Sequence, residues 1–168
     1  REKRLDQKYE KMAYEMNTHN DYDFSEEIDE DINDNVLRLL FMTCHPALSK
    51  NARVALTLRL VGGLTTEEIA HAFLVPEATI AQRIVRAKRR LATANVPFEI
   101  PQKSDYRERL SSVLEVIYLM FNEGYSATSG TNLIRMNLCN EALRVGKVLA
   151  DLMPIEPEVY GLIALMEI

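Results

Sequence analysis

The side chains with the clearest chemistry lie in residues 77–93, where cations share a helical pattern with an apolar stripe. Ile80, Ile84, Ala87 and Leu91 recur at the spacing of one helix face, so this face is predicted to pack on protein. The other faces carry polar groups, which are Glu77, Thr79, Gln82, Arg83, Arg86, Lys88, Arg89 and Arg90. This pattern predicts a helix that is buried on one side and positively charged on the other.

A helix of this polarity suits the major groove of DNA. The groove admits an α-helix whose first residues reach base edges, while cations farther along neutralise phosphates. We therefore expect Glu77, Thr79 and Gln82 to contact bases. The predicted phosphate contacts, which include one hydroxyl of the preceding segment, are Thr66, Arg83, Arg86, Lys88, Arg89 and Arg90. The alternative for such a cluster is a solvated basic face on an ordinary helix.

The segment before this helix favours DNA binding. Thr65 or Thr66 offers an N-cap hydroxyl, and acidic residues follow in the first turn, where the helix dipole favours them. Leu74, Val75 and Pro76 form a three-residue turn, so a short helix over 66–73 and a longer one over 77–93 make a helix-turn-helix. Glycine is common where Leu74 stands, and a left-handed Leu74 would cost about 1–2 kcal/mol.

Charge is distributed unevenly along the 168 residues, whose net charge is −5. Residues 36–94 carry 9 basic and 3 acidic groups, whereas residues 21–35 carry 8 acidic groups and no basic ones. The acidic stretch has too few apolar residues to order itself and is predicted to be a linker. Residues 3–16 show an amphipathic helical spacing. We therefore predict a first segment, 1–35, made of a helix and an acidic linker.

The rest of the chain is predicted to be all-α in two parts. Residues 36–95 contain four helical segments separated by Pro46, Gly62-Gly63 and the turn at Pro76, with Ser49 as the expected cap of the second. Residues 105–168 contain three more, over 106–122, 133–152 and 156–168. They form a C-terminal extension. Because the chain begins with Arg1 and ends within a helical pattern, we expect a fragment cut at both ends.

Other classes of protein find little support in the sequence. No stretch is long and apolar enough for a membrane helix, and the charged N-terminus excludes a signal peptide, so a cytoplasmic location is expected. Cys44 and Cys139 lie in apolar helical patterns and are predicted to be buried free thiols. Cys44-His45 lacks a second ligand pair, so no metal or cofactor is expected. Residues 122–126 contain polar groups around Glu123, but no nucleophile-base pair accompanies them, so helix capping by Gly124 is preferred to catalysis.

Residues 64–70, LTTEEIA, followed by residues 78–91, ATIAQRIVRAKRRL, resemble region four of extracytoplasmic-function sigma factors of the sigma-70 family. Residues 39–48 and 113–126 are similar to one subgroup, whose members continue into a helical extension with repeat-like helix pairs. The resemblance covers residues 32–168. It implies that residues 36–94 bind the upstream, minus-thirty-five promoter element and that their first two helices dock on the β-subunit flap of RNA polymerase. Nothing here resembles region two, so we expect no transcription initiation by this fragment alone.

Three alternatives remain open at this point. A stand-alone helix-turn-helix regulator would use its C-terminal helices to bind an effector or to dimerise, and two recognition helices would then lie about one DNA turn apart. A helical interaction scaffold would use the basic helix to bind an acidic protein. An enzyme ranks last, because no catalytic residues can be named. The sequence leaves the oligomeric state, the promoter sequence and the direction of any regulation by the C-terminal helices undecided.

Overall fold

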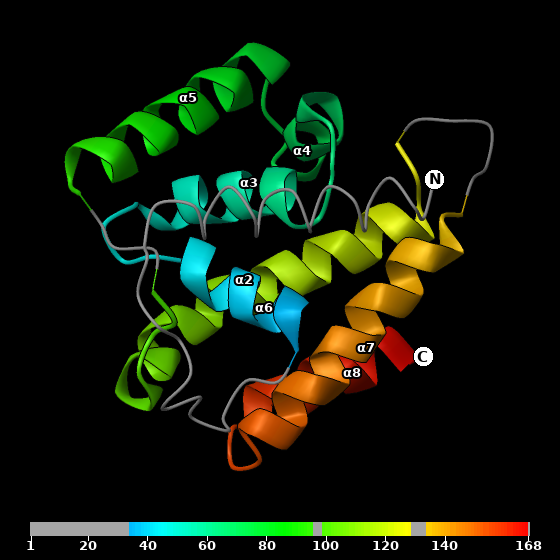
Figure 1. Cartoon of the computed structure of the whole chain (residues 1–168). Coiled ribbons are helices and arrows are strands. Elements are labelled where there is room, and N and C mark those ends of the chain that lie inside the picture. The colour runs from blue at the N-terminus through cyan, green and yellow to red at the C-terminus, as the bar shows by residue number, and fades with distance from the viewer. Residues whose placement is uncertain (1–33, 96–98, 129–133, 168) are drawn as a thin grey trace. The chain divides into compact units, whose positions relative to one another are not determined.

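The computed structural model describes residues 34–95, 99–128 and 134–167, and all regular secondary structure within them is helical. This confirms the all-α prediction for the described residues. The helix predicted at 3–16 and the acidic linker before Asp34 lie outside them. The helices, labelled as in Figure 1, are α2 (Asn35–Thr43), α3 (Lys50–Leu60), α4 (Thr66–Ala72), α5 (Glu77–Thr93), α6 (Lys103–Tyr125), α7 (Met136–Leu152) and α8 (Pro157–Glu167).

The first two helices begin at polar residues, but only one of these caps with its side chain. Asp34 accepts a hydrogen bond from the Leu37 amide at 2.9 Å and so stabilises the start of α2. Ser49 occupies the N-cap position of α3, yet its hydroxyl makes no capping hydrogen bond, contrary to the prediction. Gly63 ends the segment of α3 as expected, since it has a φ of 66° and turns the chain toward α4.

Helix α6 lies between the helix-turn-helix and the last two helices. It contacts α2, α3 and α4 on one hand and α7 and α8 on the other (Figure 1). It runs from Lys103 to Tyr125, beyond both ends of the predicted 106–122. The predicted stop at Gly124 is wrong because this glycine lies inside the helix. A Cβ there would come within 2.7 Å of the Cys139 Sγ, so Gly124 permits close packing of α6 on α7.

The contact between α6 and the first two helices combines aromatic packing with charge. Phe41 of α2 and Tyr106 of α6 pack with ring centroids 4.8 Å apart. Beside them Arg109, which is 7% exposed, donates from Nη1 to the Phe41 carbonyl oxygen at 2.9 Å. At the other side of this contact Lys50 pairs with Glu115 at 2.9 Å. Residues Asp31–Ile168 accordingly form one compact unit. No described helix has the length and apolar character that a membrane crossing requires.

Candidate nucleic-acid interface

The structure contains the predicted helix-turn-helix, and a capping box fixes the start of its first helix. Thr65, rather than Thr66, is the N-cap of α4, and its Oγ1 accepts a hydrogen bond from the Glu68 amide at 3.1 Å. In return Glu68 Oε2 accepts a hydrogen bond from the Thr65 amide at 2.8 Å. A seven-residue helix is short, so these two bonds contribute to its stability at the end where backbone amides lack helical partners.

The turn between α4 and α5 carries backbone strain. Leu74 has a φ of 53°, in the left-handed region that costs a non-glycine residue about 1–2 kcal/mol. The Leu74 amide donates to the His71 carbonyl and the Val75 amide to the Ala70 carbonyl, at 3.1 and 3.0 Å. The hydrogen bonds of the turn therefore hold Leu74 in this conformation, while its side chain is 88% exposed.

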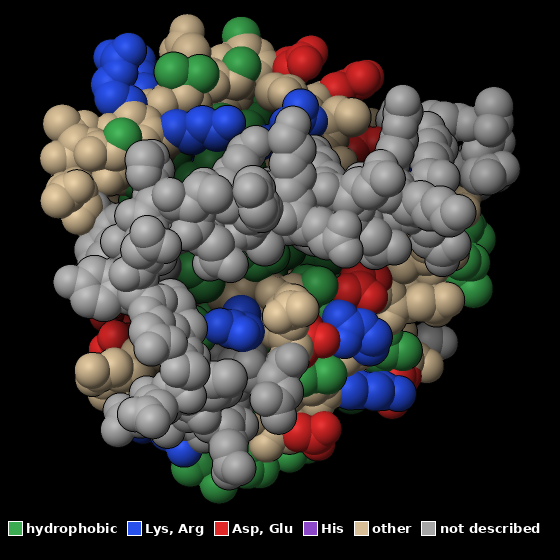
Figure 2. Space-filling model, in the orientation of Figure 1, with side chains coloured by type: hydrophobic (Ala, Val, Ile, Leu, Met, Phe, Trp, Pro, Cys, Tyr) green, Lys and Arg blue, Asp and Glu red, His purple; other side chains and the backbone are tan. Residues whose placement is uncertain are grey.

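Helix α5 is buried along three of the four positions of the predicted apolar stripe, and the fourth, Leu91, is half-buried. Ile80, Ile84 and Ala87 are at most 8% exposed, and the helix packs on α3 and α4 through this face. The three predicted base contacts, Glu77, Thr79 and Gln82, are all exposed. Figure 2 shows basic side chains over α5 and acidic ones gathered where α5 meets α4. An exposed polar N-terminal half with cations farther along is the arrangement that major-groove recognition requires.

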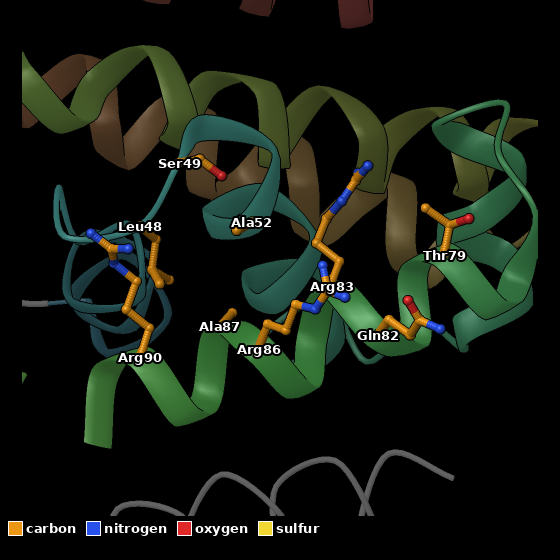
Figure 3. A pocket seen from close by; sticks show the side chains of 9 residues that line it. All are labelled: Leu48, Ser49, Ala52, Thr79, Gln82, Arg83, Arg86, Ala87 and Arg90. Carbon is orange, nitrogen blue, oxygen red and sulfur yellow. The ribbon is translucent and has the colours of Figure 1, made fainter. Parts of the chain in front are cut away.

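A groove with a volume of about 380 Å³ lies between α3 and α5 (Figure 3). None of its lining residues is acidic, so the positive charge of its arginines is not neutralised within the groove. Figure 3 shows Arg90 extending toward Leu48 and Arg86 extending toward Arg83. Leu48, Ser49 and Ala52 line it from the α3 side, and Thr79, Gln82, Arg83, Arg86, Ala87 and Arg90 line it from α5. The groove can accommodate a negatively charged group such as a phosphate.

Some of the predicted DNA contacts line the groove, and others do not. Thr66, Glu77, Lys88 and Arg89 do not line it. At 100° per residue Arg89 shares the outward face of α5 with Gln82, whereas Lys88 lies on the flank away from the groove. The predicted phosphate contacts therefore lie on more than one face of the helix-turn-helix. Ser49 is an addition, since the sequence predicts it only as a helix cap.

Two of the arginines already have partners within the protein. The Arg83 guanidinium lies 5.2 Å from the centroid of the Phe73 ring, and its Nη1 atom is buried without a hydrogen-bond partner. Arg90 donates from Nε to the Ala47 carbonyl oxygen at 2.7 Å. These contacts orient both side chains before any ligand arrives. Arg86 and Arg89 are exposed, so their side chains can adapt to the positions of DNA phosphates.

The remaining candidate residues are buried side chains of the helical core. Cys44 and Cys139 are buried free thiols as predicted, and burial raises the pKa of Cys44 to about 11. The described residues contain no cluster of three or more metal-ligating side chains. Glu123, one of the polar groups of residues 122–126, lies within α6 and is 4% exposed. Its carboxylate accepts hydrogen bonds from the amide and hydroxyl of Thr128, at 2.8 and 2.6 Å.

Comparison with known proteins identifies two segments. A family model described as sigma-70, region 4 matches residues 38–91. The chain carries a sigma-70 region 4 domain. A second model, for a family of unknown function (DUF6596), matches residues 109–168, beyond the region 4 domain. An uncharacterized protein of Rhizobium meliloti is 51% identical over 133 residues, which make up 79% of this chain. The chain spans 31% of the length of that relative. No solved structure matches this chain.

The region 4 match supports several predictions made from the residues. The match covers the helix-turn-helix predicted over residues 66–93 except for its last two residues, and it agrees with the predicted class of sigma-70 domain. The resemblance to sigma factors is confirmed, together with its helical extension. The individual base and phosphate contacts stay predictions.

Proposed function

We propose that the region 4 domain binds the upstream, minus-thirty-five promoter element as part of an RNA polymerase sigma factor acting in the cytoplasm. One observation carries the proposal: α5 presents an exposed polar N-terminal half next to a groove lined by three arginines and no acid. Glu77, Thr79 and Gln82 are the proposed base contacts. The proposed phosphate contacts are Arg83, Arg86 and Arg90 at the groove, Arg89 on the outward face of α5, and Lys88 and Thr66 away from the groove.

The second proposed partner is the β-subunit flap of RNA polymerase, bound through α2 and α3. Both helices also pack on α6, and Phe41 and Lys50 already contact Tyr106 and Glu115 there. The C-terminal helices thus occupy part of the surface of the helices proposed to bind the flap. This supports a regulatory role for α6–α8, exerted on the attachment of the region 4 domain to polymerase.

Fluorescence anisotropy with labelled duplexes, one containing a promoter upstream element and one scrambled, tests DNA binding by the whole chain. At about −0.9 for each phosphate neutralised, the five proposed cationic contacts predict a slope of about −4.5 for the logarithm of the binding constant against the logarithm of salt concentration. Arg86→Ala and Arg89→Ala should each reduce this slope by about 1 and weaken binding to both duplexes. Arg107→Ala is the matched control, because Arg107 is an exposed arginine of α6 that pairs with Glu156.

Base contacts are distinguished from phosphate contacts by their dependence on sequence. Gln82→Ala should cost about 1–3 kcal/mol on the promoter duplex and little on the scrambled one. Equal losses on both duplexes would show that Gln82 does not read bases. If the wild-type chain binds neither duplex at low salt, the proposed DNA binding is wrong.

A further inference from the structure

Arg135, in the connection between α6 and α7, bridges two buried carboxylates. Its Nη1 atom lies 3.0 Å from Glu68 Oε1 and 3.7 Å from Glu123 Oε1. The side chains of the two glutamates are 6% and 3% exposed, so each carboxylate is removed from most of the solvent. Buried carboxylates need a nearby cation or hydrogen-bond donors to remain charged. One guanidinium therefore compensates acids from two different parts of the fold.

Glu68 belongs to the helix-turn-helix and is fixed there by the capping box. Its Oε2 accepts from the Thr65 amide, which leaves Oε1 for Arg135. The same carboxylate thus stabilises the start of α4 and receives the cation from the α6–α7 connection. Any displacement of Arg135 acts directly on the first turn of α4.

The connection also reaches the other end of α4. Thr128, which donates to Glu123, has its Oγ1 atom 3.1 Å from Nδ1 of His71 in the last turn of α4. Arg135 is itself held by its backbone, because its amide donates to the Gly124 carbonyl at 2.6 Å. The short helix α4 is therefore contacted at its start and at its end by residues that follow α6 in the chain.

Helix α4 supports α5, which packs on it through its buried face. From these contacts we propose that Arg135 is a positioning residue: by bridging Glu68 and Glu123 it braces α4 and so sets the orientation of α5 toward DNA. In this proposal Arg135 acts through α4 and not through a contact of its own with DNA. The inference rests on the proposed DNA-binding function, and it assigns a role to the start of α7 within the segment that matches the family of unknown function.

The test combines hydrogen exchange, followed by mass spectrometry, with DNA anisotropy on the whole chain. Arg135→Met leaves two buried carboxylates without their cation, which favours separation of α4 from the connection. We expect faster exchange of the amides of α4 and its turn, and a loss of affinity for the promoter duplex between about 2-fold and 30-fold. Arg107→Met is the control, since it removes an arginine of α6 whose partner Glu156 lies in the α7–α8 connection. This control should change neither quantity.

Arg135→Lys separates positioning from general stability. Lysine keeps the charge but lacks the planar, forked donor group of arginine, so it should restore part of the affinity and part of the α4 protection. If Arg135→Met fails to fold, the same two measurements on Arg135→Lys test the proposal. Unchanged α4 exchange in Arg135→Met, or unchanged affinity while the wild type binds, overturns the proposal. If the wild type does not bind DNA, the proposed function is wrong. The hydrogen exchange of the α4 amides would still show whether Arg135 holds α4 in place.

Discussion

The guanidinium of Arg83 lies over the ring of Phe73, 5.2 Å from its centroid. Phe73 is the C-cap of α4 and Arg83 belongs to α5, so this contact spans the turn of the helix-turn-helix. It joins the residue that ends α4 with one that is predicted to contact a DNA phosphate. The first half of the motif thereby orients a cation of the second half at the groove.

Replacing the aromatic ring should weaken DNA binding without removing a charge. Phe73→Leu keeps an apolar side chain but loses the cation–π contact, which is worth about 0.5–1 kcal/mol at such sites. We expect the dissociation constant for the promoter duplex to rise by about 2-fold to 5-fold at fixed salt. Phe121→Leu in α6 is the control, because Phe121 stacks on Tyr125 and lies outside the motif. Equal effects of the two substitutions would contradict a specific role for Phe73.

The loss of folding stability at acidic pH should depend on His45. Burial lowers the pKa of His45 below 6.5, and the positive charges of Arg109 and Arg53 lower it further. The folded state therefore favours the neutral ring, whose Nδ1 accepts a hydrogen bond from the Ala47 amide at 3.1 Å. The stability associated with His45 is complete above pH 6.5 and is lost as the pH falls below that value.

Asn can replace the acceptor of His45 without titrating. Its side-chain oxygen hydrogen-bonds to a backbone amide two residues on in the common Asx turn, as Nδ1 of His45 does here. His45→Asn should therefore match the wild type at about pH 7.5 and lose less stability on transfer to about pH 5.5, as measured by urea unfolding. Parallel loss in both proteins would rule out His45 as the responsible group.

Relief of the strained turn should stabilise the protein. Leu74 is left-handed and 88% exposed, so Leu74→Gly removes the conformational penalty and little packing. We expect a gain of about 1 kcal/mol in the free energy of unfolding. Leu74→Ala removes the same exposed side chain but keeps the penalty, and it should leave the stability near that of the wild type. A gain of equal size for Ala would show that strain is not the cause.

Two helical glycines should respond oppositely to alanine. A Cβ at Gly124 would lie 2.7 Å from Cys139 Sγ and 2.8 Å from the Cys139 backbone nitrogen, so the helices must move apart. We expect Gly124→Ala to destabilise by about 1–3 kcal/mol. At Gly161 a Cβ meets nothing within 4 Å, so Gly161→Ala should stabilise by up to about 1 kcal/mol through helix propensity. Thermal unfolding of the two variants measures both changes, and a stable Gly124→Ala protein would contradict the close packing.

Local sequence patterns determine the helix-turn-helix. The apolar stripe of α5, the threonine cap of α4 and the proline of the turn are encoded within a few residues of where they act, because helix periodicity and capping depend on near neighbours. The strain at Leu74 was also predictable from its place in the turn. The sequence by itself therefore determined the fold class, the motif and the basic face of α5.

Only the tertiary structure decided which polar groups meet. Arg135 and Glu68 are 67 positions apart, and Arg90 and Ala47 are 43 apart, so no local pattern could pair them. Gly124 illustrates the limit, since a glycine near a helix end predicts a stop, whereas here the approach of α7 requires it inside the helix. Such pairings follow from how helices pack. The local sequence determines the helices, but their burial against one another determines which charges they share.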